Sequence, residues 1–454
     1  MEENNIDNNN GNNHPLSVID EKPELTTLML ATKMQNDNES LLSNKILSKL
    51  SKGYTFYTVI KAISYSINET SFILPYCLRK LGIIPFFLFL LLLPLPSIYI
   101  FYLLIDLVIK YNLYDDYHTI IQQNTNKITN LLYYIITLVY HILIIIFENK
   151  LYLSLCLRVL SFFDISFGNN YKEQIIILLI SLIFFEFPFS FIKKFKKPDL
   201  LYIIFTILYI ILNIISLVFV IIYKSSDKLK LIEINLYEDI SKSYLTCYSI
   251  FIIVVGWQSQ FSKHLKDFKI KTTKRFYKVI YFFFIIQLFL ITFICFVSAP
   301  LISDKADLII FVFDNQNLNI THIIIIDIAA LIFGLYIHII IAHHIQLIQD
   351  RLKLILQLTI YKTKPKFKIN KYLSVSFNLF ILVLTNFICL FFDDLSLIII
   401  IYGGIFSTLI NFLFPAILYW FMISKNSLAT WLGLLISIIM ILFGILALIL
   451  KILL

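Results

Sequence analysis

The stretch Lys61-Ala-Ile-Ser-Tyr-Ser-Ile-Asn-Glu-Thr-Ser-Phe-Ile-Leu-Pro-Tyr76 decides how the chain is interpreted. It belongs to an apolar run, residues 54–80, that is long enough to cross a bilayer as a helix. Its centre, Asn68-Glu69-Thr70-Ser71, places a carboxylate at membrane depth, where an ionised group costs roughly 3 kcal/mol or more. Pro75 follows, and proline removes a helical hydrogen bond. The pattern predicts a first membrane helix that is interrupted near its middle, with Glu69 facing the protein interior or a wet cavity.

The composition is that of a polytopic helical membrane protein. Of the 454 residues, 59% are hydrophobic and 15% are charged, and the mean hydropathy is +0.83. Soluble domains are only about 45–50% apolar and about 25% charged. We therefore predict an all-α fold that has the lipid bilayer as its surroundings. The net charge of +9 implies no nucleic acid partner, because basic loops on one side of the membrane account for it.

Eleven apolar runs are predicted to span the membrane. They are 54–80, 82–109, 130–157, 174–192, 199–223, 245–262, 276–301, 320–348, 372–392, 395–422 and 429–453. The preceding residues, 1–53, are polar and rich in Asn, which predicts a disordered cytosolic tail. The transmembrane domain is accordingly predicted to occupy residues 54–454.

Lys and Arg are concentrated in alternate connections between these runs. The basic segments include residues 193–197, 263–278 and 351–371. Positive loops remain in the cytoplasm, so the N-terminus is predicted to be cytosolic. The expected location is the plasma membrane or a vacuolar or lysosomal membrane.

The sixth run, 245–262, is also interrupted near its middle, by Gly256, Trp257, Gln258 and Ser259. If the first ten helices form two repeats of five, the odd number makes the second repeat inverted relative to the first. The repeats would be 54–223 and 245–422, and 429–453 would be an extra peripheral helix. Interrupted helices at matching positions of inverted halves are typical of transporters with a midplane site.

Three segments are similar to the amino acid/auxin permease family. Phe72-Ile-Leu-Pro-Tyr76 with Gly82 resembles the family's first-helix motif. Gly403–Tyr419, which includes Pro415, resembles its tenth helix, and Ile345–Arg351 is similar to the end of its eighth. The resemblance extends over about residues 50–454. It implies a LeuT-type fold and secondary transport of amino acids or related small amine-containing solutes.

The chain departs from the family at the positions that concern ion coupling. Ser64 stands where the family has a helix 1 Asn, and Ala342 stands where a Ser or Thr joins it at a sodium site. Asn68-Glu69-Thr70 replaces a small, Gly-rich break, and Trp257-Gln258 replaces the family's helix 6 element. Fewer hard oxygen ligands remain for sodium, so we expect transport to be driven by protons.

The two breaks offer complementary partners for a zwitterion. A helix that begins after a break inside the membrane exposes N–H groups and the positive end of its dipole at its N-terminus, and both suit a carboxylate. The carbonyl end near Val255 suits an ammonium group. The predicted substrate-binding residues are Asn68, Glu69, Thr70, Ser71, Gly256, Trp257, Gln258 and Ser259.

Glu69 has three competing roles. It is the coupling group if burial keeps it protonated, the site of a cationic amine substrate, or the structural partner of a buried base such as Lys150. Asp327 and His338 are further proton-coupling candidates, since their spacing with Gly334 puts all three on one helix face. The alternative for His338 is an interior histidine bonded to a carbonyl.

Several polar residues in the apolar runs have predicted structural roles. Glu148-Asn149-Lys150 either pair with one another or face the substrate, and Ser407 and Asn411 satisfy backbone groups freed by Pro415. Asp106 and Glu186 lie near span ends and are expected to reach water. His343 and His344 are expected at the cytosolic interface. The five cysteines read as small buried hydrophobes, and no metal or cofactor is predicted.

Two other functional classes compete with transport. A membrane acyltransferase also carries intramembrane histidine, but no Ser/His/Asp or metal-ligand spacing accompanies the histidines here. A solute sensor would keep the transporter fold without turnover. The expectation is therefore a protein that is not an enzyme, with transport favoured over sensing.

Overall fold

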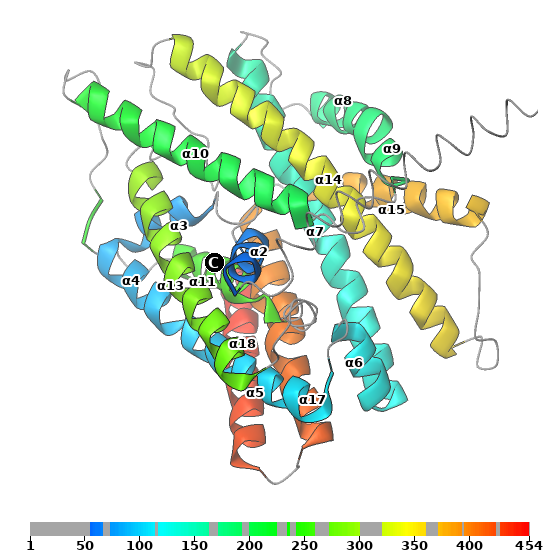
Figure 1. The fold of residues 1–454 in the computed structure, drawn as a ribbon. Coiled ribbons are helices and arrows are strands. Elements are labelled where there is room, and N and C mark those ends of the chain that lie inside the picture. Colours follow the sequence, from blue (N-terminus) through cyan, green and yellow to red (C-terminus); the bar gives the residue numbers. More distant parts are fainter. Residues whose placement is uncertain are drawn as a thin grey trace, which may run out of the picture. The chain divides into compact units, whose positions relative to one another are not determined.

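The computed structural model describes residues 55–66, 73–113, 117–162, 171–192, 199–224, 234–236, 242–258, 272–299, 320–359, 371–392, 395–423 and 427–453. The chain divides into two units between residues 52 and 53, and all described residues belong to the second unit. The predicted tail, 1–53, lies outside the described residues. Every regular element in the described ranges is a helix (Figure 1).

The helices follow the predicted apolar runs closely, although several runs consist of more than one helix. In chain order they are α2 (Thr55–Ser66), α3 (Leu74–Leu81), α4 (Ile83–Leu92), α5 (Pro94–Tyr111), α6 (Tyr117–Asn124), α7 (Lys127–Phe162), α8 (Tyr171–Ser181), η2 (Leu182–Glu186), α9 (Phe187–Phe189), α10 (Asp199–Lys224), α11 (Lys242–Val255), α13 (Thr273–Ser298), α14 (Ile320–Thr359), α15 (Lys371–Phe391), α16 (Leu395–Ile399), η5 (Ile400–Ser407), η6 (Leu409–Leu413), α17 (Phe414–Met422) and α18 (Leu428–Leu453).

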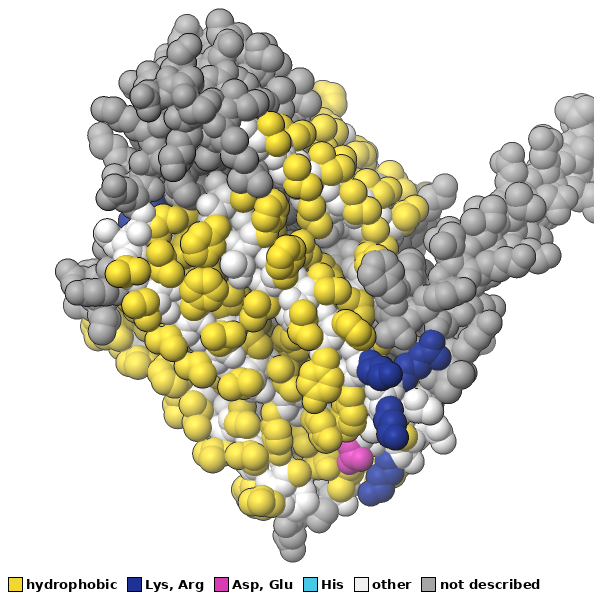
Figure 2. All heavy atoms as spheres, turned by 60° about the vertical axis from the view of Figure 1, so that its left-hand side comes forward, with side chains coloured by type: hydrophobic (Ala, Val, Ile, Leu, Met, Phe, Trp, Pro, Cys, Tyr) yellow, Lys and Arg dark blue, Asp and Glu magenta, His cyan; other side chains and the backbone are white. Residues whose placement is uncertain are grey.

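Seven stretches within the described residues are long and apolar enough to cross a membrane. They are Ile83–Tyr111, Lys127–Leu157, Thr273–Val297, Leu331–Thr359, Tyr372–Phe391, Leu395–Met422 and Leu428–Leu453. The protein is therefore a polytopic helical membrane protein. The outer surface agrees, since Figure 2 shows a broad hydrophobic face bordered by Lys and Arg side chains. Soluble proteins rarely expose so large an apolar area.

Proline and glycine set the joints between successive helices. The second predicted run is divided at Pro94, which begins α5 and has no N–H to donate. Gly82 separates α3 from α4 with φ 79°, a left-handed conformation that glycine adopts without strain. The first amide groups of α4 are satisfied from elsewhere: Ile83 and Ile84 donate to the carbonyls of Asn235 and Leu236 at 3.0 and 2.8 Å.

The predicted end of the eighth helix is wrong, and two other runs contain π-helical segments. α14 continues beyond the predicted end at residue 348 to Thr359, because the basic segment that follows is rich in Leu, Gln and Lys, which are good helix formers. The fourth and tenth runs are not regular α-helices, since η2, η5 and η6 are π-helical. Such segments are rare and occur frequently at functional sites.

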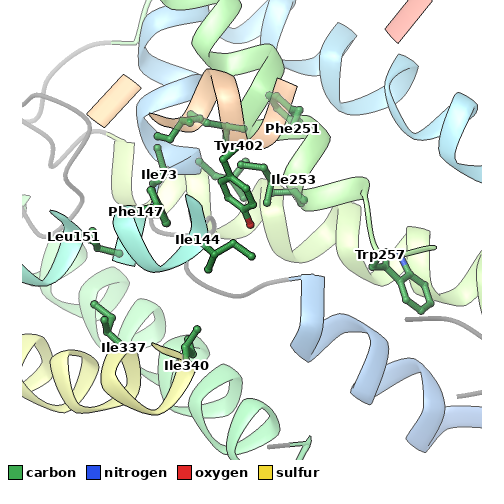
Figure 3. Packing of buried hydrophobic residues seen from close by; sticks show 14 of the residues in the cluster. Ile73, Ile144, Phe147, Leu151, Phe251, Ile253, Trp257, Ile337, Ile340 and Tyr402 are labelled. Atoms are coloured by element: carbon green, nitrogen blue, oxygen red, sulfur yellow. The ribbon is translucent and has the colours of Figure 1, made fainter. Parts of the chain in front are cut away.

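The core is built around α7 and α14, which pack along each other. Phe147 and Leu151 of α7 and Ile337 of α14 belong to one buried cluster with Ile73 and Ile253 (Figure 3). Ile73 immediately precedes α3, and Ile253 lies in the last turn of α11. α2 lies among α10, α11 and α13 (Figure 1). The start of α3 and the end of α11 are thus interior.

α18 attaches to this core through a stripe of small side chains. Its buried residues, Thr430, Gly433, Ser437, Met440, Gly444 and Ala447, recur at intervals of three and four, which defines one helix face. At Gly444 the backbones touch, because a Cβ there would lie 2.0 Å from the carbonyl oxygen of Gly404 in η5. Small residues permit such close approach between membrane helices.

Candidate functional site

The first predicted run contains two described helices, one on either side of the predicted break. α2 ends at Ser66, and α3 begins at Leu74 with Pro75 in its first turn. The residues between them that were predicted to bind substrate, Asn68, Glu69, Thr70 and Ser71, lie outside the described residues. Ile73 and Leu74 are fully buried, so the N-terminal end of α3 opens inside the protein.

The sixth helix is also interrupted where the sequence predicts it. α11 ends at Val255, and Gly256 and Trp257 are not helical. The last carbonyl groups of a helix lack partners within it, and here polar side chains of two other helices supply them. Ser97 of α5 donates to the Val255 carbonyl at 2.8 Å, and Gln287 of α13 donates to the Val254 carbonyl at 2.8 Å.

The predicted site residue Gln258 belongs to the same arrangement. Its amide Nε2 donates to Ser97 Oγ at 2.6 Å, so Ser97 connects Gln258 with the end of α11. The Gln258 side chain is fully buried, and its Oε1 has no hydrogen-bond partner among the described residues. A buried, unused acceptor next to a helix break is the kind of group that a ligand donor could reach. Ser259 lies outside the described residues.

Gly256 and Trp257 are placed by packing. A Cβ on Gly256 would lie 3.0 Å from Ser407 Oγ and 3.1 Å from Asn411 Nδ2, so the absence of a side chain lets the π-helical segments η5 and η6 approach. The Trp257 ring lies between Phe101, at 4.8 Å, and Phe283, at 4.3 Å. Asn411 donates to Ser407 Oγ at 3.2 Å, which links these two side chains to each other.

Helix α7 carries a buried polar group close to this region. Glu148 and Asn149 are both fully buried, next to Phe147, whose ring lies 6.0 Å from that of Tyr402 in η5. Of the two alternatives for this group, pairing is not seen for Asn149, because neither atom of its amide has a hydrogen-bond partner among the described residues. An amide buried without partners costs about 1–3 kcal/mol, which a bound polar ligand would offset.

A second polar cluster joins four helical segments. Ser181, at the end of α8, donates to Glu186 Oε1 at 2.5 Å. Asn386 of α15 donates to Glu186 Oε2 at 2.8 Å, and Ser181 Oγ lies 3.5 Å from Nδ1 of His338 in α14. The expectation that Glu186 reaches water is wrong, since it is 0% exposed. The π-helical turn of η2 places it on the inner face.

The cluster is not a nucleophilic triad, although it contains Ser, His and Glu. In such a triad the carboxylate orients the histidine, and the histidine accepts the serine proton. Here the carboxylate itself receives the Ser181 hydroxyl, and the His338 contact is long. The geometry therefore gives no activated nucleophile.

Two histidines meet between α7 and α14. His141 Nδ1 and His344 Nδ1 are 3.0 Å apart, and the His343 ring lies 5.5 Å from that of His344. His344 therefore packs against α7, and its expected position at the cytosolic interface stays a prediction. Among the described residues no group of three His, Cys, Asp or Glu could hold a metal ion.

The sequence singled out His338 but missed its partners. Ser181 and Asn386 come from distant helices, and no spacing rule connects them with residue 338. The signal that could have identified Glu186 was its place inside an apolar run, where a carboxylate needs partners. Asp327 belongs to α14, and its side chain lies outside what the structure describes.

No family model and no curated protein matches the chain.

Proposed function

We propose that this protein is a secondary active transporter of amino acids or related small amine-containing solutes. Substrate binds near mid-membrane between the breaks of the first and sixth helices, and access alternates between the two sides. Protons drive the transport.

The observation that carries the proposal is the pair of interrupted helices in one buried core. α11 packs directly against α3 and contacts α2, so the two breaks belong to neighbouring helices. Irregular backbone at membrane depth is tolerated where it is buried in protein or lines a cavity. Among the described residues, the amide of Asn149 and the Oε1 atom of Gln258 have no hydrogen-bond partner, so they are buried polar atoms that a polar solute could engage.

Helix packing supports an inverted repeat of five helices. The test is to exchange predicted helices 1–5 with predicted helices 6–10 and to compare their contacts. The contact of α2 (helix 1) with α10 (helix 5) then corresponds to that of α11 (helix 6) with η5 (helix 10). The contact of α15 (helix 9) with α7 (helix 3) corresponds to that of η2 and α9 (helix 4) with α14 (helix 8). The contact of α17 (helix 10) with α5 (helix 2) corresponds to that of α10 (helix 5) with α13 (helix 7). The central pair, α7 and α14, maps onto itself. The proposal therefore includes eleven spans with a cytosolic N-terminus, with α18 outside both repeats.

Uptake by the purified protein tests the proposal. The protein is reconstituted into sealed lipid vesicles with an inward proton gradient, and labelled amino acids and small amines are tested in turn. A transporter accumulates at least one solute above the external concentration, and collapse of the gradient releases it. Saturable binding without accumulation would indicate a solute sensor instead. Chemical conversion of the solute would indicate an enzyme.

We expect uptake to be independent of sodium. Ala342 is buried and offers no oxygen. Of the two positions, only Ser64 therefore has a hard oxygen ligand, and its hydroxyl donates to the Ile60 carbonyl at 2.7 Å within α2. Replacement of sodium by choline at constant pH should leave the initial uptake rate unchanged. A collapse of uptake in choline would contradict proton coupling.

A further inference from the structure

The buried cluster around Glu186 has the geometry of a proton-binding site. Ser181 and Asn386 are the hydrogen-bond partners of the carboxyl, and among the described residues no Lys or Arg forms an ion pair with it. A carboxylate buried without a cation is expensive, and taking up a proton removes that charge. The cluster also lies on helices other than those that carry the two breaks.

The Ser181 hydroxyl couples the protonation of Glu186 to the position of the hydrogen on the His338 ring. A serine has a single hydroxyl hydrogen to donate. When Glu186 is ionised, Ser181 donates to it, and the contact with His338 requires Nδ1 of the ring to carry a hydrogen. When Glu186 is protonated, it can donate to Ser181 Oγ, and Ser181 then donates to an unprotonated Nδ1. Protonation therefore reverses both hydrogen bonds.

His338 lies at the end of this series of hydrogen bonds, where a proton can enter. Its ring is stacked on Phe185 at 5.0 Å and lies 4.3 Å from the ring of Tyr152. The Nε2 atom has no hydrogen-bond partner among the described residues, although the side chain is only 1% exposed. A proton that arrives at Nε2 lets Nδ1 release its hydrogen to Ser181, which passes its own hydrogen to Glu186. One proton is taken up, and His338 ends with its hydrogen on Nε2.

Other titratable side chains of the described residues lie near the cluster on α7 and α15. Tyr152 and Cys156 of α7 interact with each other, and Tyr152 also interacts electrostatically with Glu186. Cys389 of α15 interacts electrostatically with Glu186 and with Lys150 of α7. Glu186 is the carboxyl that the hydrogen bonds of α8 and α15 converge on.

We propose that Glu186, Ser181 and His338 bind and relay a proton whose movement drives transport. The inference rests on the proton-coupled transport proposed above and deepens it. The reversal of hydrogen bonds takes place where α8, η2, α14 and α15 meet. The protonation state of Glu186 therefore changes the hydrogen bonds between these helices. A switch of this kind is a local electrostatic event that biases a larger rearrangement.

Infrared difference spectra of the purified protein at high and low pH test the site without any substrate. We expect a carbonyl band of a protonated, water-shielded carboxylic acid that Glu186→Gln abolishes. Ser181→Ala should shift the band, because the hydrogen bond that the protonated carboxyl donates to Ser181 Oγ is lost. Asp106→Asn removes an exposed carboxyl that Tyr419 contacts at 3.1 Å, and it should leave the band in place. Ser437→Ala removes a buried hydroxyl bonded within α18, and it should leave the band unshifted.

Transport by the same variants completes the test. Glu186→Gln should lose accumulation driven by the proton gradient and keep substrate counterflow. A full band in folded Glu186→Gln, an unshifted band in Ser181→Ala, or normal accumulation by Glu186→Gln would each overturn the inference. If Glu186→Gln does not fold, the Ser181→Ala shift decides the matter. A band that depends on Glu186 in a wild-type protein without uptake would support the proton site and reject the proposed transport.

Discussion

Gly444→Ala is expected to prevent the protein from folding stably. The added Cβ would lie 2.0 Å from the Gly404 carbonyl oxygen and 2.5 Å from its carbon. Because these are backbone atoms of η5, no rotation of a side chain can relieve the overlap, and α18 must move away. Overpacking in a well-packed interior costs about 1–3 kcal/mol, and a contact with backbone should lie at or above the upper end. Thermal unfolding in detergent and the yield of monodisperse protein measure the effect.

Gly334→Ala is the matched control. Gly334 is also a buried glycine inside a helix, but a Cβ there would meet only the Tyr152 ring, at 3.3 and 3.4 Å. Alanine favours helix over glycine by about 1 kcal/mol, so this variant should be as stable as the parent or slightly more so. Equal stability of the two variants would contradict the backbone contact between α18 and η5.

Glu69→Gln is expected to abolish pH-driven accumulation of substrate. Its carboxyl is predicted at the break between α2 and α3, where an ionised group at membrane depth has a specific role or a specific partner. Gln keeps the size and hydrogen bonding of the side chain while removing its charge and its titration. Uptake into vesicles with an inward proton gradient measures the loss.

Counterflow and expression then identify the role of Glu69. If it carries a coupled proton, counterflow survives in the variant. If it binds a cationic amine, substrate binding itself weakens. If it pairs with Lys150, the variant misfolds and Lys150→Met partly rescues it. Normal accumulation by well-expressed Glu69→Gln would remove the residue from the mechanism.

The helical architecture was predictable because hydrophobic length is a strong local signal in membranes. The bounds of α10, α15 and α18 agree with the predicted runs to within a residue or two, and the break after Val255 was visible as Gly256 beside polar residues. Proline and glycine also marked the joints at Pro94 and Gly82. These features depend on consecutive residues, which a single sequence displays directly.

The polar clusters were not predictable, because they depend on which helices become neighbours. Glu186 seemed to lie at a span end, yet the π-helical turn of η2 and the contact with α15 bury it. The neighbour of His344 was not visible in the sequence either, because His141 of α7, whose Nδ1 lies 3.0 Å from that of His344, is 203 positions away. Ser97 and Gln287 carried no signal, since their importance comes from the free carbonyl groups at the end of α11.

The most direct test of a midplane site at the two breaks is the accessibility of a cysteine at position 70. Thr70→Cys is made in a chain without the native cysteines, and a membrane-impermeant thiol reagent is applied to vesicles from either side. If a midplane site lies at the two breaks, we expect reaction from both sides and protection by saturating substrate. The matched control retains only Cys77, which is fully buried and should not react. Reaction from one side under all conditions, or none from either side, would contradict the account.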